Sequence, residues 1–334
     1  PYPSRSKDPD TVDFSTGSVG IGATAPIWAA LSHRYLSDRF PETPPAGRFI
    51  SLLGDAEMDE GAVWEAIIDP EVRQLGEVVW IVDLNRQSLD RVIPDMQIQR
   101  LRGMFAAADW QVLSCTWGRR LKAVFAEPGG EVFEARMRTM PNEEYQRTLR
   151  AHPSEVRGRL LSGVADEQRG ILDALLANRS DLELAELVRD LGGHDLEALQ
   201  ATFAQIDDSR PTVIFAYTIK GRGLALEGHP NNHAAQLTLD QMQELAAASG
   251  MSIEDPWHRF AEDTAAARIC AALRSRSPSA ECISGCVPAC CMRANAPSYS
   301  RVMDTACWRI SGFPCMSCGP EAGINCHTKP TASN

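Results

Sequence analysis

The sequence predicts an α/β protein with a doubly wound, mostly parallel sheet. Two short runs, residues 48–53 and 78–82, have the continuous hydrophobicity of strands that are buried on both faces. Residues 59–73 between them have helical spacing, so the three segments predict a strand, helix, strand unit. Polar side chains follow both runs, and ligands of open α/β sheets bind at the carboxyl ends of the strands.

Further elements extend this unit on both sides. Residues 111–116 and 212–217 predict a third and a fourth strand, the latter from its β-branched and aromatic residues. Helices are expected over residues 23–39, 95–108, 196–206 and 238–248. The charged residues 127–190 predict a helical insertion that covers one face of the sheet.

Composition narrows the class of protein. The chain has 334 residues, a net charge of −11 and 44% hydrophobic residues, which suits a soluble globular protein of one or two domains. The acidic balance argues against nucleic acid as a partner. Apolar runs are too short for a membrane span and no signal peptide is visible, so we expect a cytoplasmic protein. Since the chain begins with Pro1, we expect a fragment or a processed product.

The polar residues after the first two strands suit a cation that holds a phosphate. Asp55 offers a carboxylate and Asn85 an amide oxygen. Mg²⁺ takes about six oxygen ligands, few of them from protein and the rest from phosphate and water. The backbone N–H groups around Ala56 and Glu57 suit a diphosphate at the start of a helix. The alternative is that Asp55 only N-caps this helix.

Residues 54–60, Gly-Asp-Ala-Glu-Met-Asp-Glu, and the Asn85 that follows Asp55 by thirty positions resemble the thiamine diphosphate signature. The full motif of residues 54–60 resembles that of the homodimeric pyruvate dehydrogenase E1 component of the transketolase superfamily. The resemblance extends over roughly residues 10–262. The resemblance implies that Mg²⁺ is bound by Asp55, Asn85 and the backbone carbonyl of Gln87. The cofactor-binding positions that it implies are Gly17, Ser18, Val19, Gly54, Asp55, Ala56, Glu57, Asp83, Asn85 and Gln87.

The sequence departs from the family at two of these positions. Ala56 stands where the family has glycine, which leaves the backbone less free to approach a diphosphate. Asp83 stands where the E1 branch usually has asparagine, and its negative charge is expected to weaken diphosphate binding. Gly17, Ser18 and Val19 lie in a glycine-rich loop that could equally be an ordinary turn before a helix.

Two catalytic candidates lie after the fourth strand. The resemblance places Lys220 near the cofactor or substrate, although a surface lysine after a strand is the simpler explanation. His233 matches the loop histidine of the E1 family, which implies a role in stabilising the intermediate or moving protons. His229 competes with it. The turn at His194 and Asp195 also resembles the superfamily, but we interpret it as a cap on the helix that follows.

The resemblance implies an E1-like reaction, in which a 2-oxo acid such as pyruvate is decarboxylated and its acyl unit passes to the lipoyl group of an acyltransferase. The alternative enzyme is a transketolase-like one that transfers ketol units between sugar phosphates. Family members build each active site, commonly in a dimer, with a pyrimidine-binding domain or second subunit that supplies an activating glutamate. No candidate for that glutamate is identifiable here, so a third hypothesis is an inactive remnant or a subunit that needs a separate pyrimidine-binding chain.

The last part of the chain has a different composition. We divide the chain into a thiamine diphosphate-binding domain at residues 1–262, with the insertion at 127–190, and a tail at 263–334. Nine of the ten cysteines fall in this tail, among many Ser, Pro and Ala residues. Only Cys315 and Cys318 have a common zinc-ligand spacing, which leaves a metal-binding module as a weaker alternative. We expect the tail to be disordered or poorly packed, with the composition of sequence read out of frame.

Overall fold

The computed structural model describes residues 12–14, 17–43, 45, 47–88, 91–92, 98–255 and 259–276. The chain divides into two compact units, of which the first, Pro1–Arg34 with Ala46–Ile253, contains the sheet. The second unit, Tyr35–Pro45 with Glu254–Asn334, contains helix α12 (Ala265–Arg276). The cysteine tail after residue 276 lies outside the described residues, and the domain boundary at 262–263 stays a prediction.

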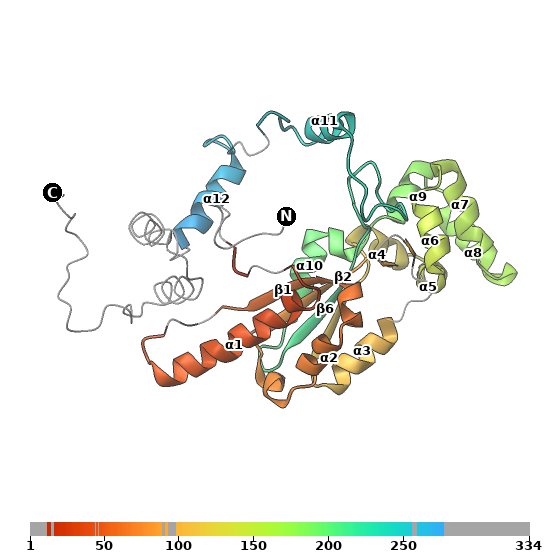
Figure 1. Ribbon diagram of the computed structural model, residues 1–334. Helices are drawn as coiled ribbons and strands as arrows, with labels where there is room; N and C mark the ends of the chain where they lie inside the picture. The colour runs from red at the N-terminus through yellow and green to blue at the C-terminus, as the bar shows by residue number, and fades with distance from the viewer. Residues whose placement is uncertain are drawn as a thin grey trace, which may run out of the picture. The chain divides into compact units, whose positions relative to one another are not determined.

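A parallel sheet of four strands forms the centre of the first unit (Figure 1). Its order is β1 (Phe49–Gly54), β2 (Val78–Leu84), β6 (Thr212–Tyr217) and β5 (Gln111–Cys115). Gly54 pairs with Asp83 and Leu84 with Tyr217, so the carboxyl ends of three strands meet at one edge. The α/β class and the four predicted strands are confirmed. A short hairpin, β3 (Gln87–Ser88) and β4 (Arg91–Val92), follows β2.

Helices make up most of the rest of the described chain. The α-helices of the first unit are α1 (Ile21–Arg39, which ends in the second unit), α2 (Gly61–Ile67), α3 (Ile98–Ala107), α4 (Arg119–Phe125), α5 (Gly130–Thr139), α6 (Asn142–Leu149), α7 (Pro153–Ser162), α8 (Asp166–Leu176), α9 (Asp181–Leu187), α10 (Leu196–Phe203) and α11 (Leu239–Ala248). The 3₁₀-helices are η1 (Asp55–Asp59), η2 (Pro70–Gln74) and η3 (Gly192–His194). Among the described residues, none of the helices has the length and hydropathy needed to cross a membrane.

Helices cover both faces of the sheet because the side chains of each strand alternate. Trp80 and Val82 of β2 belong to the larger apolar core, which they share with residues of α1, α2 and α3. Val79 and Ile81 point to the other face and pack with residues of α10. This second face is covered incompletely, since Ile50 and Leu52 of β1 are exposed.

Two expectations about helices need correction. The helix predicted over residues 59–73 is divided into α2 and η2, because Pro70 has no backbone N–H to continue a helix and its ring clashes with the preceding turn. Residues 127–190 contain α5 to α9, but these helices gather beside the sheet, where α6 contacts the β3–β4 hairpin, and the faces are covered by α1 to α3 and α10 (Figure 1). The first part of the helix predicted over 95–108 lies outside the described residues.

Candidate functional site

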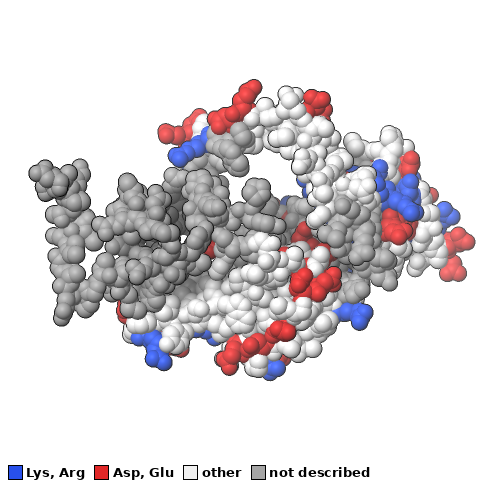
Figure 2. Space-filling view, in the orientation of Figure 1, with Lys and Arg blue, Asp and Glu red and all other residues white. Residues whose placement is uncertain are grey.

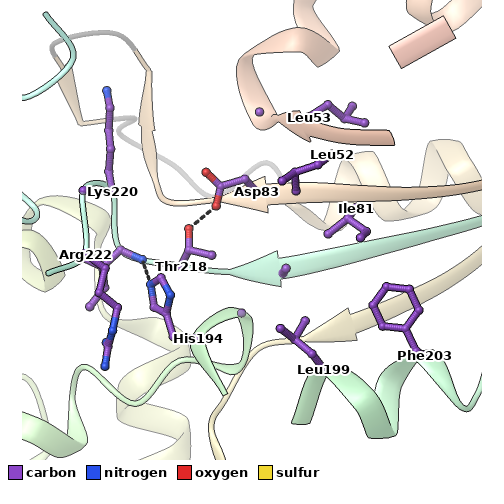
Figure 3. Close-up of a pocket in the computed structure, with 15 residues that line it drawn as sticks. Leu52, Leu53, Ile81, Asp83, His194, Leu199, Phe203, Thr218, Lys220 and Arg222 are labelled. Carbon is purple, nitrogen blue, oxygen red and sulfur yellow. Dashed lines mark hydrogen bonds between the residues drawn. The ribbon is translucent and has the colours of Figure 1, made fainter. Parts of the chain in front are cut away.

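A cavity of about 770 Å³ lies where β1, β2 and β6 end. Its floor is apolar, formed by Leu52, Ile81, Leu199 and Phe203, and its polar end lies at the tips of the strands (Figure 3). The polar end contains Gly54, Asp83, His194, Thr218, Lys220 and Arg222. The structure therefore brings three of the predicted site residues, Gly54, Asp83 and Lys220, to one cavity.

Asp55 follows β1 directly and is half-buried at this edge of the sheet. Burial, with the nearby Asp83 carboxylate as a second cause, raises the pKa of Asp55 to about 7. A hydrogen bond with the Ala56 backbone and the charge of Lys220 oppose the rise. Neither η1 nor α2 has a side-chain cap, so the alternative that Asp55 serves as an N-cap is wrong.

Asp83 and Asn85 lie at the end of β2, next to Asp55. One Asp83 oxygen accepts a hydrogen bond from the Thr218 hydroxyl, which joins β2 to the end of β6 (Figure 3). The other accepts from the Asn85 amide, 3.0 Å away. The Asn85 side-chain oxygen in turn accepts a bond of 3.0 Å from the Gln87 backbone N–H. These bonds fix the side chains of the predicted metal-binding turn.

The glycine-rich loop approaches the same edge through Glu57. The backbone N–H of Gly20 donates a hydrogen bond of 3.1 Å to a carboxylate oxygen of Glu57 in η1. Gly20 has a φ of +86°, a left-handed conformation that glycine adopts without strain. Gly17, Ser18 and Val19 precede it on the surface, and Val19 is 60% exposed. All three residues are therefore accessible to solvent.

The two catalytic candidates have different positions. Lys220 lines the cavity and is close enough to Asp55 to influence its pKa. His233 is exposed in the loop after β6 and does not line the cavity. Its predicted role would therefore need the loop to close over a ligand.

His194 is a cavity residue that the sequence analysis assigned only to a helix cap. Asp195 does cap α10, since its carboxylate accepts from the N–H groups of Glu197 and Ala198. His194, however, points toward the end of β6, where its Nε2 accepts a hydrogen bond from the Ile219 N–H (Figure 3). Burial, and then the charge of Arg222, lowers the pKa of His194. The resemblance of this turn to the superfamily was the signal that could have identified it.

A hard cation suits the chemistry of these donors. Oδ2 of Asp55 is buried and has no hydrogen-bond partner, which is rare for a carboxylate oxygen in a folded protein. The neighbouring Asp83 carboxylate and Asn85 amide add oxygen atoms of the kind that Mg²⁺ prefers. Within the described part of the chain, no three His, Cys, Asp or Glu residues lie together as a metal site. The predicted Mg²⁺ ligands are not such a group, because they combine one carboxylate with an amide oxygen and a backbone carbonyl.

Comparison with known proteins agrees with the motifs. Residues 3–127 match the family described as "Transketolase, thiamine diphosphate binding domain". The pyruvate dehydrogenase E1 component of Pseudomonas aeruginosa is 31% identical over 259 residues, which are 74% of this chain and 27% of that protein. The E1 component of Corynebacterium glutamicum is 29% identical over 262 residues, 76% of this chain and 27% of that protein. The resemblance inferred from residues 54–60 and Asn85 is confirmed.

The chain spans less than a third of the length of these relatives. Among solved structures, a transketolase variant from Pichia stipitis is similar with a TM-score of 0.45 and 18% sequence identity, and the match covers 81% of this chain and 30% of that one. A transketolase from Leishmania mexicana has a TM-score of 0.43.

Proposed function

We propose that this chain, which is similar to pyruvate dehydrogenase E1 components, is the part of such an enzyme that binds the diphosphate of thiamine diphosphate through Mg²⁺. The observation that carries the proposal is the buried, unpartnered oxygen of Asp55 beside a second carboxylate at the ends of β1 and β2. Two carboxylates that are partly removed from water repel each other, and a divalent cation bound by Asp55 would relieve this repulsion.

Three groups would hold the metal ion, namely the Asp55 carboxylate, the Asn85 amide oxygen and the backbone carbonyl of Gln87. The backbone N–H groups of Ala56 and Glu57, together with the Gly17–Val19 loop, would lie against the phosphates and the rest of the cofactor. Thiamine diphosphate, when bound, supplies the nucleophilic carbon that a 2-oxo acid needs in order to lose CO₂.

Lys220, His233 and Asp83 would contribute charge, proton exchange and hydrogen bonding to the site. The ammonium group of Lys220 would balance the charge of the diphosphate or of the substrate carboxylate. The imidazole of His233 would exchange a proton with the reacting molecule once its loop closes. Asp83 keeps its hydrogen bonds to Thr218 and Asn85 and thereby orients the metal-binding turn.

The full reaction would need partners. We propose a 2-oxo acid as substrate and a lipoyl-bearing acyltransferase as acceptor of the acyl unit. The described part of the chain offers no recognised glutamate to activate the aminopyrimidine. A pyrimidine-binding domain or a second subunit would therefore complete the site, and we expect the isolated chain to bind cofactor weakly and turn over little.

Calorimetric titration of thiamine diphosphate with Mg²⁺ into the full chain tests the proposal. Asp55→Asn should abolish the binding heat because it removes the charged ligand. Asp173→Asn is a matched control, since Asp173 is exposed on α8. Absence of binding to the unaltered chain at millimolar cofactor, or equal binding to both variants, would overturn the proposal.

A further inference from the structure

Arg86 occupies an unusual place, between the two predicted metal-binding residues Asn85 and Gln87. Its backbone φ is +64°, in the left-handed region that residues with a Cβ atom rarely adopt. Its side chain is only 2% exposed, and none of its three guanidinium nitrogens has a hydrogen-bond partner. Burial lowers the pKa of Arg86. The turn is thus held in a conformation that is unfavourable in itself.

Helix α6 supplies several of the contacts that hold this turn, beside the ring of Tyr217 in β6, whose centroid lies 5.7 Å from the guanidinium carbon of Arg86. The ring of Tyr145 lies 4.1 Å from the guanidinium carbon of Arg86, within the range of a cation–π contact. The Tyr145 hydroxyl donates a hydrogen bond of 2.8 Å to the Val188 carbonyl, which fixes the ring. Tyr145 is 1% exposed, so this contact is fully shielded from water.

The next residue of α6 binds both sides of the same turn. Nε2 of Gln146 donates to the Asn85 carbonyl over 3.2 Å, and its Oε1 accepts from the Gln87 side chain over 3.1 Å. The Gln87 amide also donates to the Gly228 carbonyl, 3.2 Å away. One buried side chain therefore connects both predicted metal-binding residues and, through Gln87, the loop that carries His233.

We propose that α6 is a positioning element of the cation site, with Tyr145 and Gln146 holding Arg86 in the left-handed conformation that orients Asn85 and Gln87. The inference rests on the proposed function and extends it to residues of the helical insertion that touch neither metal nor cofactor. Groups that orient metal ligands commonly change metal affinity 10- to 100-fold when they are replaced.

The test measures Mn²⁺ binding to the full chain by electron paramagnetic resonance, with thiamine diphosphate present and without turnover. Gln146→Met keeps the size of the side chain and removes its hydrogen bonds, and we expect about a tenfold loss of Mn²⁺ affinity. Leu172→Ala is the control, because Leu172 is fully buried in α8 and its loss lowers stability without touching the turn. Urea unfolding shows that each variant is folded under the conditions of the titration.

Two substitutions at Arg86 separate the effect of the backbone conformation from the effect of losing the positive charge. In the Gln146→Met background, Arg86→Gly should restore most of the affinity because glycine adopts a positive φ freely, whereas Arg86→Ala should not. Equal affinity of Gln146→Met and the unaltered chain, an equal loss in Leu172→Ala, or equal rescue by glycine and alanine would overturn the inference. If the unaltered chain itself binds no Mn²⁺, the proposed function fails and the inference fails with it.

Discussion

The imidazole of His194 accepts a hydrogen bond of 2.7 Å at Nε2 from the backbone N–H of Ile219. In the neutral ring the proton must then lie on Nδ1. The bond joins η3 to Ile219, the second residue of the loop that follows β6 and carries Lys220. A protonated imidazole carries hydrogen on both nitrogens and cannot accept this hydrogen bond. The position of the loop therefore depends on a neutral His194.

The first prediction concerns the pH dependence of this bond. Because the pKa of His194 is lowered in the folded protein, the unfolded chain binds more protons at this residue between that pKa and 6.5, and the contribution of His194 to stability rises with pH over this window. His194→Gln should remove the rise, since a glutamine oxygen accepts at every pH, and the difference should be about 1 kcal/mol. Urea unfolding from about pH 4.5 to 8 measures it. The same slope in both proteins would contradict the prediction.

The second prediction concerns Asp55 without metal or cofactor. Its folded pKa of about 7 lies above the ordinary value of 3.8, so the folded chain binds more protons at this residue over this range and the contribution of Asp55 to stability falls as the pH rises from 3.8 to 7. Asp55→Asn should abolish the fall and be more stable near pH 8 by about 4 kcal/mol. Near pH 3 the two should be equal. Unfolding in a chelator measures the effect, and Asp173→Asn should behave like the unaltered chain.

The third prediction concerns Gly193 beside His194. A Cβ atom at Gly193 would lie 2.6 Å from the Tyr217 carbonyl oxygen and 2.6 Å from a Thr218 methyl group. Gly193→Ala should therefore cost about 1–3 kcal/mol of unfolding free energy, as overpacked sites do. Gly170→Ala is the matched control in α8, where nothing lies within 4 Å of the added atom and the helix should gain about 0.5–1 kcal/mol. Equal shifts of the denaturant midpoint in Gly193→Ala and Gly170→Ala would refute this explanation.

The strands of the sheet could be predicted because their signal is local. Residues 78–82 are apolar at every position, as a strand covered on both faces requires, and β2 extends over Val78–Leu84. The position of Asp55 follows from the same logic, since it comes directly after β1. The break at Pro70 was also visible in the sequence, but helical spacing on both sides of it concealed two short helices.

The contacts that orient the site could not be predicted. Gln146 bonds to Asn85 and Gln87 across about sixty residues of chain, and no periodic pattern encodes such a pairing. The left-handed conformation of Arg86 has no local signal either, because arginine has no preference for positive φ. The cap function of Asp195 concealed the role of its neighbour His194, since one short turn serves both.

The incompletely covered face of the sheet affects how this protein can be handled. β1 is an edge strand of the described sheet, carries no charged residue between Phe49 and Gly54, and leaves Ile50 51% and Leu52 74% exposed. Uncharged edge strands with bare apolar side chains recruit other strands and aggregate. A concentrated stock of this chain is expected to precipitate on storage. Ile50 does not line the cavity, so Ile50→Lys places a positive charge on the strand without altering the cavity lining. The substitution should reduce aggregation of samples used for binding measurements.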